Sequence, residues 1–543
     1  MEQRTLLAIV LSVLVLMLFQ YFFAPPPQPR VPAQGPAEAP AAGKTPPAPA
    51  ATPAPAATPA PAALAPAPAP AAPRRPARTV TVKTDLYELA FTELGGRLTS
   101  CRLLRYRESV APDSPPLELV RVPAAAAPLG LRLGQGGLLD LSGVTFTADR
   151  TSVELGTAEA AALRFTAPLA GGGRVTRTYT FHRGSYLVDM TVEVRDAAGH
   201  PVPMPTEVDF ASPAGQKNRY TFAGISYYTP DGLQEIRLKK AGETHDYAGP
   251  LEWLGHGDVY FLSAVIPEGA PSSRLHLRRL GEDRIESRIA PDFSAPPARF
   301  QLYLGPKEID ILAAAGHHLE KAVNFGWFDP IARPLLWVLK FFHRFLHNYG
   351  VAIILLTVLI KLLFWPLAHK GMKSMKTMQK LQPKLAKIKE KYADDRERMN
   401  RELMQLYKTY KVNPVGGCLP MLLQIPVFFA LYKVLLLSIE MRHAPFALWI
   451  NDLSAPDRLM IPGVEIPFLG GIPVLTILMG VSMWAQQKMS PSSLDPTQAK
   501  LMLFLPVVFT FTFLSLPSGL VLYWLVNNVL SIVQQAAINR LPD

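Results

Sequence analysis

A lysine lies inside an otherwise uncharged apolar stretch of this 543-residue chain. Lys361 occurs in GVAIILLTVLIKLLFWPLA, seven residues before that stretch ends, and Thr357 lies one helical turn before it. At about 1.5 Å of rise per residue, Lys361 would lie roughly 10 Å inside a membrane boundary. Ionisable groups at such a depth are costly and usually face a hydrated interior, where a cation attracts anionic groups. The alternative is that the flexible stem carries the ammonium group to the headgroup layer.

Polar side chains recur in the other apolar stretches, most of them toward the same end. They are Gln424, Gln486, Gln487, Asn528, Ser531 and Gln535. The last three are spaced i, i+3 and i+7, which places them on one helical face. These groups either join helices by hydrogen bonds or, together with Lys361, line a water-filled groove.

Six apolar stretches are long enough to cross a bilayer core of about 30 Å, and they predict six transmembrane helices. They cover residues 6–23, 350–368, 417–439, 470–488, 500–516 and 519–538. The connection 369–413 carries thirteen Lys and Arg residues against five acidic ones, which predicts a cytoplasmic position. If the sides alternate from there, both chain ends are cytoplasmic and the long segment after the first helix is external.

The beginning of the chain predicts an anchor and a linker. Residues 1–23 resemble a signal peptide, but Ala24 is followed directly by three prolines, so we expect an uncleaved signal anchor. Residues 24–78 are dominated by Pro and Ala and predict an extended, flexible linker. Gly43-Lys44-Thr45 resembles the end of a phosphate-binding loop, but Glu38 occupies the place of its first glycine, so no nucleotide site follows.

Residues 79–325 predict an all-β sandwich domain outside the cytoplasm. Residues 186–194 alternate apolar and polar side chains with the period of two typical of a half-buried strand. Other strands are predicted at Thr79–Leu89, Gly143–Leu155, Ala162–Ala167, Val175–His182, Val259–Ile266 and Arg299–Leu304. Because the acidic and His residues form no cluster with ligand spacing, we expect no catalytic residues, metal or cofactor there.

Two amphipathic segments flank the second predicted span. Residues 326–348 predict a Trp-bearing helix that lies in the outer interface or, alternatively, packs on other helices. Residues 370–411 predict a cytoplasmic helical hairpin, with Pro383 in the first turn of its first helix. Its lysines either bind ribosomal RNA or hold the topology and contact anionic lipid. Cys101 and Cys418 fall on opposite sides of the membrane, so no disulfide is expected.

Four long motifs resemble the YidC family of membrane protein insertases, in its Gram-negative form with a large periplasmic domain. They are NPVGGCLPMLLQIPVFFALY (413–432), APFALWINDLS (444–454), QQKMSP (486–491) and PSGLVLYWLVNN (517–528). The resemblance implies a five-helix core at 349–543 in the bacterial inner membrane. The best-known members carry Arg where this chain has Lys361, so the charge is kept but the guanidinium fork is lost.

The resemblance also implies how such a chain works. Nascent hydrophobic proteins would enter the membrane through a hydrophilic groove open to the cytoplasm, without hydrolysis of a nucleotide. The groove residues would be Lys361, Thr357, Gln424, Phe428, Trp524, Asn528 and Ser531. The implied partners are nascent membrane proteins, the Sec translocon with its accessory subunits, the ribosome and signal recognition pathway at the hairpin, and membrane lipids.

Other functions stay as alternatives at this point. A transporter or channel would use Lys361 as an anion site, although the spans show no inverted repeat. A sugar- or partner-binding module would make the β-domain primary and the membrane part its anchor. An enzyme is the weakest alternative because no catalytic pair or metal spacing emerges.

Overall fold

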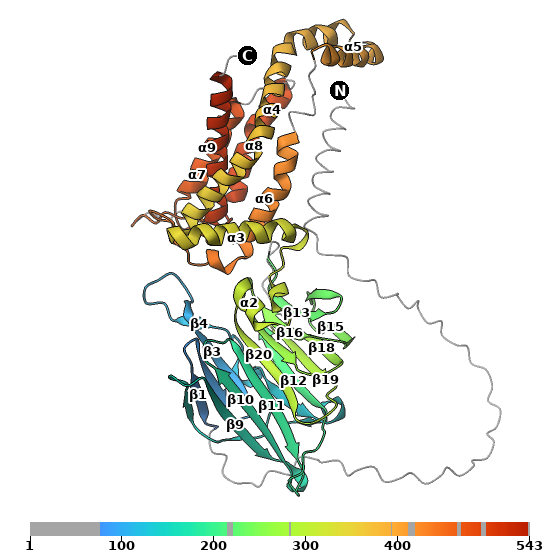
Figure 1. Ribbon diagram of the computed structural model, residues 1–543, viewed down its shortest axis with the longest axis vertical. Helices are drawn as coiled ribbons and strands as arrows, with labels where there is room; N and C mark the ends of the chain where they lie inside the picture. Colours follow the sequence, from blue (N-terminus) through green and yellow to red (C-terminus); the bar gives the residue numbers. More distant parts are fainter. Residues whose placement is uncertain are drawn as a thin grey trace, which may run out of the picture. The chain divides into compact units, whose positions relative to one another are not determined.

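The structure is a computed structural model, and it describes residues 77–213, 221–281, 284–392, 394–410, 419–463, 469–489 and 496–540. The predicted signal anchor, most of the predicted linker and Cys418 lie outside these residues. Up to Pro306 the described chain is mostly β-sheet, and from Ile309 onward it is mostly helical (Figure 1).

Three sheets make up the described part of the β-rich domain, and nearly all of their strand pairs are antiparallel. The first has the order β4-β3-β2-β1-β8, from Pro116–Glu118, Arg97–Arg107, Tyr87–Thr92, Thr79–Lys83 and Ser152–Glu154. The second has the order β14-β13-β16-β17-β20-β11-β10-β9-β7, from Gly232–Ile236, Gly224–Thr229, Trp253–Gly257, Phe261–Pro267, Ala298–Pro306, Leu187–Arg195, Arg174–His182, Ala160–Pro168 and Thr147–Ala148. The third has the order β15-β18-β19-β12-β5-β6, from Thr244–Gly249, Ser273–Leu280, Arg284–Pro291, Thr206–Pro213, Gly130–Leu133 and Leu139–Asp140.

The alternation read from the sequence corresponds to burial in the central strands. In β11, Val188, Met190, Val192 and Val194 are buried while their neighbours are not. Aromatic side chains join the first sheet to the second, because the ring of Phe91 lies 4.8 Å from that of Tyr179. Burying such large rings is the main favourable term for a sheet packing of this kind.

Two predicted strands are interrupted in the structure. The prediction of one strand at Thr79–Leu89 is wrong, because β1 and β2 are separated by a turn at Thr84. The hydroxyl of Thr84 accepts from the backbone N–H groups of Leu86 and Tyr87, which bends the chain where hydropathy still alternates. Gly143–Leu155 likewise contains only two short strands, β7 and β8.

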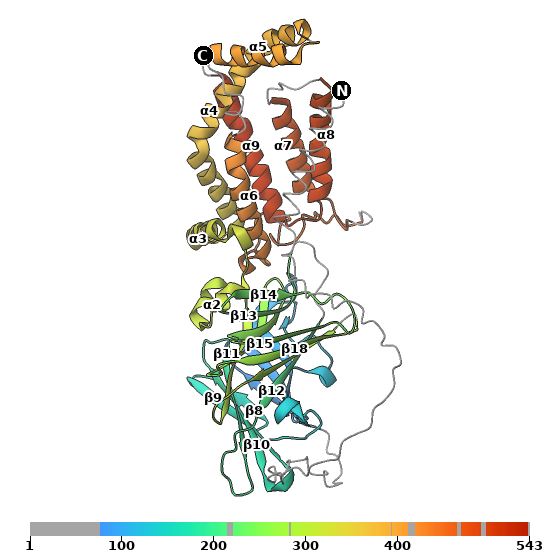
Figure 2. The same ribbon diagram turned by 90° about the vertical axis from the view of Figure 1, so that its right-hand side faces the viewer.

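Eight α-helices are described in the second half of the chain. They are α2 Ile309–Ala315, α3 Asp329–Leu346, α4 Tyr349–Lys391, α5 Arg396–Thr409, α6 Leu419–Leu437, α7 Val474–Met489, α8 Pro496–Phe513 and α9 Ser518–Arg540. Helix α9 packs against α4, α6 and α7, and α7 also packs against α8. The helices α4, α6, α7, α8 and α9 run side by side, and α3 crosses the end of this bundle where α4 and α9 begin (Figures 1 and 2).

Two of the described helices are long and apolar enough to cross a membrane. They comprise Tyr349–Met372 in α4 and Ser518–Ile538 in α9. Shorter apolar stretches occur in α6 at Leu422–Leu437 and in α8 at Phe504–Phe513. The membrane part therefore has at least these two clear spans, and the full set of six stays a prediction.

Helix α4 continues far beyond its apolar part. The expectation that Pro383 lies in the first turn of a separate helix is wrong, because α4 runs through Pro366 and Pro383 to Lys391. Its end pairs with α5 through an apolar contact. Leu381 and Leu385 pack with Met378, Leu403, Leu406 and Tyr407. This contact surrounds Pro383 and offsets the backbone hydrogen bond that this proline removes.

Helix α3 has the amphipathic pattern predicted for it. Ala332, Leu336 and Leu339 are buried against the bundle, while Trp337, Phe341 and Phe345 are exposed. The rings of Trp337 and Phe341 stack at 5.8 Å, and those of Phe341 and Phe345 meet edge to face at 5.1 Å. The exposed side of α3 is thus a continuous aromatic row.

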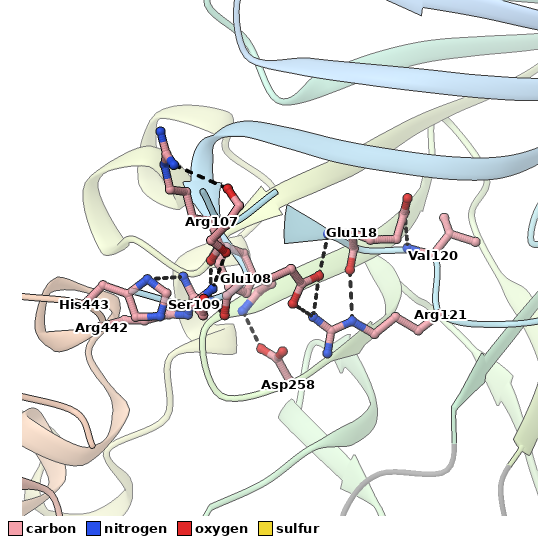
Figure 3. A network of polar contacts seen from close by, with 11 residues as sticks. Arg107, Glu108, Ser109, Glu118, Val120, Arg121, Asp258, Arg442 and His443 are labelled. Carbon is pink, nitrogen blue, oxygen red and sulfur yellow. Dashed lines mark hydrogen bonds and ion pairs between the residues drawn. The ribbon is translucent and has the colours of Figure 1, made fainter. Parts of the chain in front are cut away.

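The connection between α6 and α7 (Ser438–Pro473) touches the β-domain through Arg442. Its guanidinium group donates to the backbone carbonyls of Arg107, at 2.7 Å, and Glu108, at 3.3 Å. It also lies over the ring of Phe261, 5.3 Å from the centroid. Figure 3 shows this contact beside the Arg121–Glu108 ion pair, which holds the same β3–β4 segment.

A second charged contact lies two residues earlier in this connection. Lys340 of α3 approaches three carboxylates, those of Asp310 at 2.5 Å, Glu440 at 3.4 Å and Glu308 at 3.5 Å. The side chain of Glu440 is only 7% exposed, and burial raises the pKa of its carboxyl. The hydrogen bond to Asp310 and the three negative charges outweigh burial and raise the pKa of Lys340.

Candidate functional site

Lys361 projects from α4 toward α9. Its Nζ donates to the hydroxyl of Ser531 at 2.7 Å, and that hydroxyl donates to the backbone carbonyl of Asn527 at 2.7 Å. No carboxylate is recorded beside the ammonium group among the described residues. A hydroxyl fixes the direction of a cation but does not neutralise it, so its charge remains available to an anionic ligand.

Gln424 reaches the same level from a third helix. Its Nε2 on α6 donates to the Oδ1 of Asn527 at 2.9 Å. Asn527 thus receives Gln424 on its side chain and Ser531 on its carbonyl. We call Lys361, Ser531, Asn527 and Gln424 the polar layer, which joins α4, α6 and α9. Asn527 itself was missed in the sequence, where the helical spacing favoured its neighbour Asn528.

Asn528 and Gln535 face a different helix. The Nδ2 of Asn528 donates to the hydroxyl of Ser482 on α7 at 3.0 Å, and Asn528 is buried. The Nε2 of Gln535 donates to the carbonyl of Met489 at 2.5 Å. Both bonds join α9 to α7, as interhelical hydrogen bonds do in membrane bundles. The structure therefore divides the predicted polar stripe of α9 between two neighbours.

Thr357 is not part of the polar layer either. Its side chain is fully buried, and its hydroxyl donates to the carbonyl of Ile353 in its own helix at 2.6 Å. A hydroxyl satisfied in this way offers little to a passing chain. Lys361, one turn further on, is instead half-buried between Ile360, which is buried, and Leu362, which is exposed.

An aromatic cluster lies one helical turn from the polar layer. Phe428 meets Trp524 edge to face at 4.8 Å, and Tyr523 also stacks on Phe428 at 6.2 Å. From α8, Phe513 contacts Trp524 at 5.1 Å. Since Phe428 follows Gln424 and Trp524 precedes Asn527, the cluster lies toward the end where α9 begins. Polar and aromatic surfaces thus follow one another along α6 and α9.

The polar layer contains neither a nucleophile–base pair nor a carboxylate pair. Among the described residues, no three His, Cys, Asp or Glu side chains gather as a metal site requires. The arrangement combines one cation, two amides and one hydroxyl within an apolar bundle. Such groups can bind and release a chain by hydrogen bonds and charge attraction.

Comparisons with known proteins cover the whole described chain. The family model described as "60Kd inner membrane protein" matches residues 341–543, and the one described as "YidC periplasmic domain" matches residues 79–338. The membrane protein insertase YidC of Pelobacter propionicus is 43% identical over 100% of both chains. That of Geobacter metallireducens is 44% identical over 99% of this chain and 98% of its own.

A solved structure described as an active YidC insertase covers 86% of this chain and 94% of its own, with 19% identity and a TM-score of 0.37. That superposition is too loose to transfer positions, so the assignment relies on the sequence matches. These support membrane protein insertion in the bacterial inner membrane and a periplasmic domain, and give no support to the transporter alternative. The chain belongs to the YidC family of membrane protein insertases.

Proposed function

We propose that the polar layer is where this insertase receives the hydrophilic part of a nascent membrane protein. The observation that carries the proposal is the bond from Lys361 to Ser531, in which an intramembrane cation has a hydroxyl partner and no recorded carboxylate. An acidic tail would displace that hydroxyl and gain a charge-assisted hydrogen bond. When the tail leaves, Ser531 takes its place again.

The energetic benefit is a shorter apolar path for the client. A charged residue at the centre of a membrane helix costs about 2.5–3.5 kcal/mol on the insertion scale. The amides of Gln424 and Asn527 can replace part of the lost hydration. The groove that we propose opens to the cytoplasm at this layer, and the apolar segment of the client leaves past Phe428 and Trp524 into lipid. The membrane potential then adds to the drive.

The proposed topology has six spans, with both chain ends in the cytoplasm and the β-sandwich in the periplasm. The basic content of the connection 369–413 supports this orientation. The hairpin formed by the end of α4 and by α5 would then project into the cytoplasm. There it would contact the ribosome or the signal recognition pathway, while the Sec translocon and lipids contact the membrane part. We propose no covalent chemistry and no cofactor for the cycle.

Substitution of the cation tests the proposal directly. Lys361→Ala should slow the insertion of clients with acidic tails roughly tenfold, because about 1.4 kcal/mol of lost attraction corresponds to that factor. Lys361→Arg should keep most of the activity, and clients with neutral tails should be affected little. Insertion is measured with full-length protein in proteoliposomes by protease protection of the tail. Lys433→Ala, which removes a cation nine residues beyond Gln424 on α6, is the matched control.

Equal insertion of acidic tails by the wild-type and Lys361→Ala proteins would remove the charge from the mechanism. The position of the groove is tested separately by photocrosslinking to a stalled nascent chain. A crosslinker in place of Gln424 or Asn527 should capture the chain, whereas one in place of the buried Asn528 should capture it poorly. Stronger capture from Asn528 would move the path to the α7 side of α9.

A further inference from the structure

One exposed leucine has a backbone conformation that leucine rarely adopts. In the connection between α6 and α7, the backbone N–H of Ile450 donates to the carbonyl of Ala447 at 3.1 Å, which closes a turn around Leu448 and Trp449. Leu448 has a φ of +58°, and its side chain is 86% exposed. A side chain with a Cβ pays about 1–2 kcal/mol for the left-handed region, where Gly and Asn are usual. An exposed leucine in water gains nothing that offsets this cost.

A second leucine with the same conformation shows what normally compensates. Leu129 has a φ of +68°, but it is 1% exposed and its N–H donates to the carbonyl of Asp209. Packing and hydrogen bonding in the β-domain therefore stabilise Leu129 in its position. Leu448 has no comparable burial among the described residues, so a contact with something other than these residues would have to compensate for its conformation.

The residues around Leu448 are firmly held. The carbonyl of Phe446 accepts from Nδ2 of Asn348 at 2.8 Å, and the ring of Phe446 packs so closely on Gly350 that no side chain would fit there. The indole N–H of Trp449 donates to Asp457 at 2.7 Å. Ile450 is buried. The turn is thus fixed on both sides, and Leu448 is held outward.

The attachment through Asn348 places this turn at a membrane boundary. Asn348 also accepts from the N–H of Val351 and so caps α4, whose apolar span begins at Tyr349. It lies two residues after the end of α3, where Phe345 is 65% exposed and continues the aromatic row of Trp337 and Phe341. Leu448 therefore lies at the level where the exposed row of α3 meets the start of a span.

We propose that Leu448 inserts into the lipid at this boundary and, with the exposed row of α3, anchors the α6–α7 connection to the bilayer surface. Burial of a leucine side chain contributes about 1.5–3 kcal/mol, which is enough to offset the cost of the left-handed backbone of about 1–2 kcal/mol. The anchor would hold the outer end of the bundle at a fixed depth while a client passes the polar layer. This inference does not depend on the role of Lys361, since it concerns lipid and not the client.

The test is the depth of a spin label in vesicles. Full-length protein with Cys101→Ala and Cys418→Ala carries one new cysteine, at Leu448→Cys, and is reconstituted in phosphatidylethanolamine–phosphatidylglycerol vesicles. Accessibility of the nitroxide to oxygen and to a water-soluble nickel chelate reports its depth. Labels at Thr157→Cys, exposed in the β-domain, and Leu363→Cys, exposed on α4, give the water and lipid references.

The ratio of oxygen to nickel accessibility at position 448 should be several-fold higher than at position 157 and should approach that at position 363. A ratio equal to that at position 157 would overturn the proposal, because the leucine would then lie in water. A label at Ala447→Cys, the exposed neighbour, keeps the test decisive if labelling at 448 disturbs the turn. It should report an intermediate depth if Leu448 enters the bilayer, and a fully aqueous one if it does not.

Discussion

The β-domain and the helical core each contain a cation inside the fold, fully buried in the first and half-buried in the second, and its partners differ between them. Arg177 of β10 is fully buried, and its Nη1 donates to the backbone carbonyls of Gly96 and Leu129, both at 2.8 Å. Lys361 of α4 donates instead to one side-chain hydroxyl. These two carbonyls belong to the main chain and cannot leave, and the same Nη1 also donates to the Tyr179 hydroxyl at 3.1 Å. The partner of Lys361, the Ser531 hydroxyl, can turn away from the ammonium group at little cost, because it keeps its own hydrogen bond to the carbonyl of Asn527.

This difference separates a structural cation from one suited to binding. Gly96 and Leu129 both have positive φ angles, so Arg177 holds two unusual turns in place at the junction of the sheets. Its removal would take away the donor to the buried carbonyl of Leu129 and would leave the carbonyl of Gly96 with only the Tyr179 hydroxyl, at 3.4 Å. Removal of Lys361 leaves only a serine hydroxyl, which already donates to Asn527. We therefore expect stability to depend on Arg177 and activity to depend on Lys361.

The largest effect on stability should come from Arg177→Met. A buried carbonyl left without a donor costs about 1–3 kcal/mol, so the loss of the bond to Leu129 should lower the unfolding free energy of the β-domain by about that amount. Hydrogen exchange of β2 and β10, followed by mass spectrometry on the full-length protein, would show faster exchange. Arg174→Met, on the exposed side of the same strand, is the matched control. Unchanged exchange in Arg177→Met would mean that the guanidinium group is not a structural tie.

A smaller effect is expected from Ser531→Ala. The variant removes one hydrogen bond of Lys361 and should lower the free energy of unfolding by about 0.5–1.5 kcal/mol, with insertion of acidic tails kept. Ser482→Ala should destabilise the bundle more, because it leaves the buried amide of Asn528 without its acceptor. Thermal unfolding and the proteoliposome assay check both. Loss of insertion in Ser531→Ala as large as in Lys361→Ala would assign the role to the hydroxyl.

The smallest effect on stability is expected at Glu440, one of the carboxylates that surround Lys340. Burial raises the pKa of the Glu440 carboxyl in the folded protein above its value in the unfolded chain. The stability that this carboxyl contributes is therefore fully present at pH values below its unfolded pKa, and it is lost as the pH rises through its folded pKa. Glu440→Gln should remove that decline and raise the melting temperature at neutral pH by less than about 4 °C. Glu308→Gln, beside the same lysine, is the control. A lower melting temperature in Glu440→Gln would show that its attraction to Lys340 exceeds the cost of burial.

Much of the architecture could be predicted because it depends on patterns with a fixed period. Apolar side chains recur with a period of two in β10 and β11 and with the helical period of 3.6 in α3. The structure has strands at the first two and a helix at the third. Breaks in a pattern were harder to predict. Thr84 ends a strand through a local hydrogen bond, whereas Pro383 does not end a helix, because tertiary packing at Leu385 overrides its propensity.

The candidate site was predicted in part for a similar reason. Helical spacing identified Lys361 and Ser531, which the structure joins, and Gln424, which it brings to the same level. Spacing states which residues share a face but not which neighbouring helix that face meets. For this reason Asn528 was grouped with Ser531, although it bonds to α7, and Asn527 was missed. Nor does spacing show that the hydroxyl of Thr357 bonds within its own helix.

The unbroken length of α4 has a mechanical consequence. Its 43 residues correspond to about 65 Å, more than twice the thickness of a bilayer core of about 30 Å. Lys361 and the packing surface for α5 therefore belong to one stiff rod with no loop between them. A displacement of the α5 end would therefore be carried along the helix toward Lys361, except where α4 bends at Pro366, which lies between the two, since prolines are common sites of helix bending.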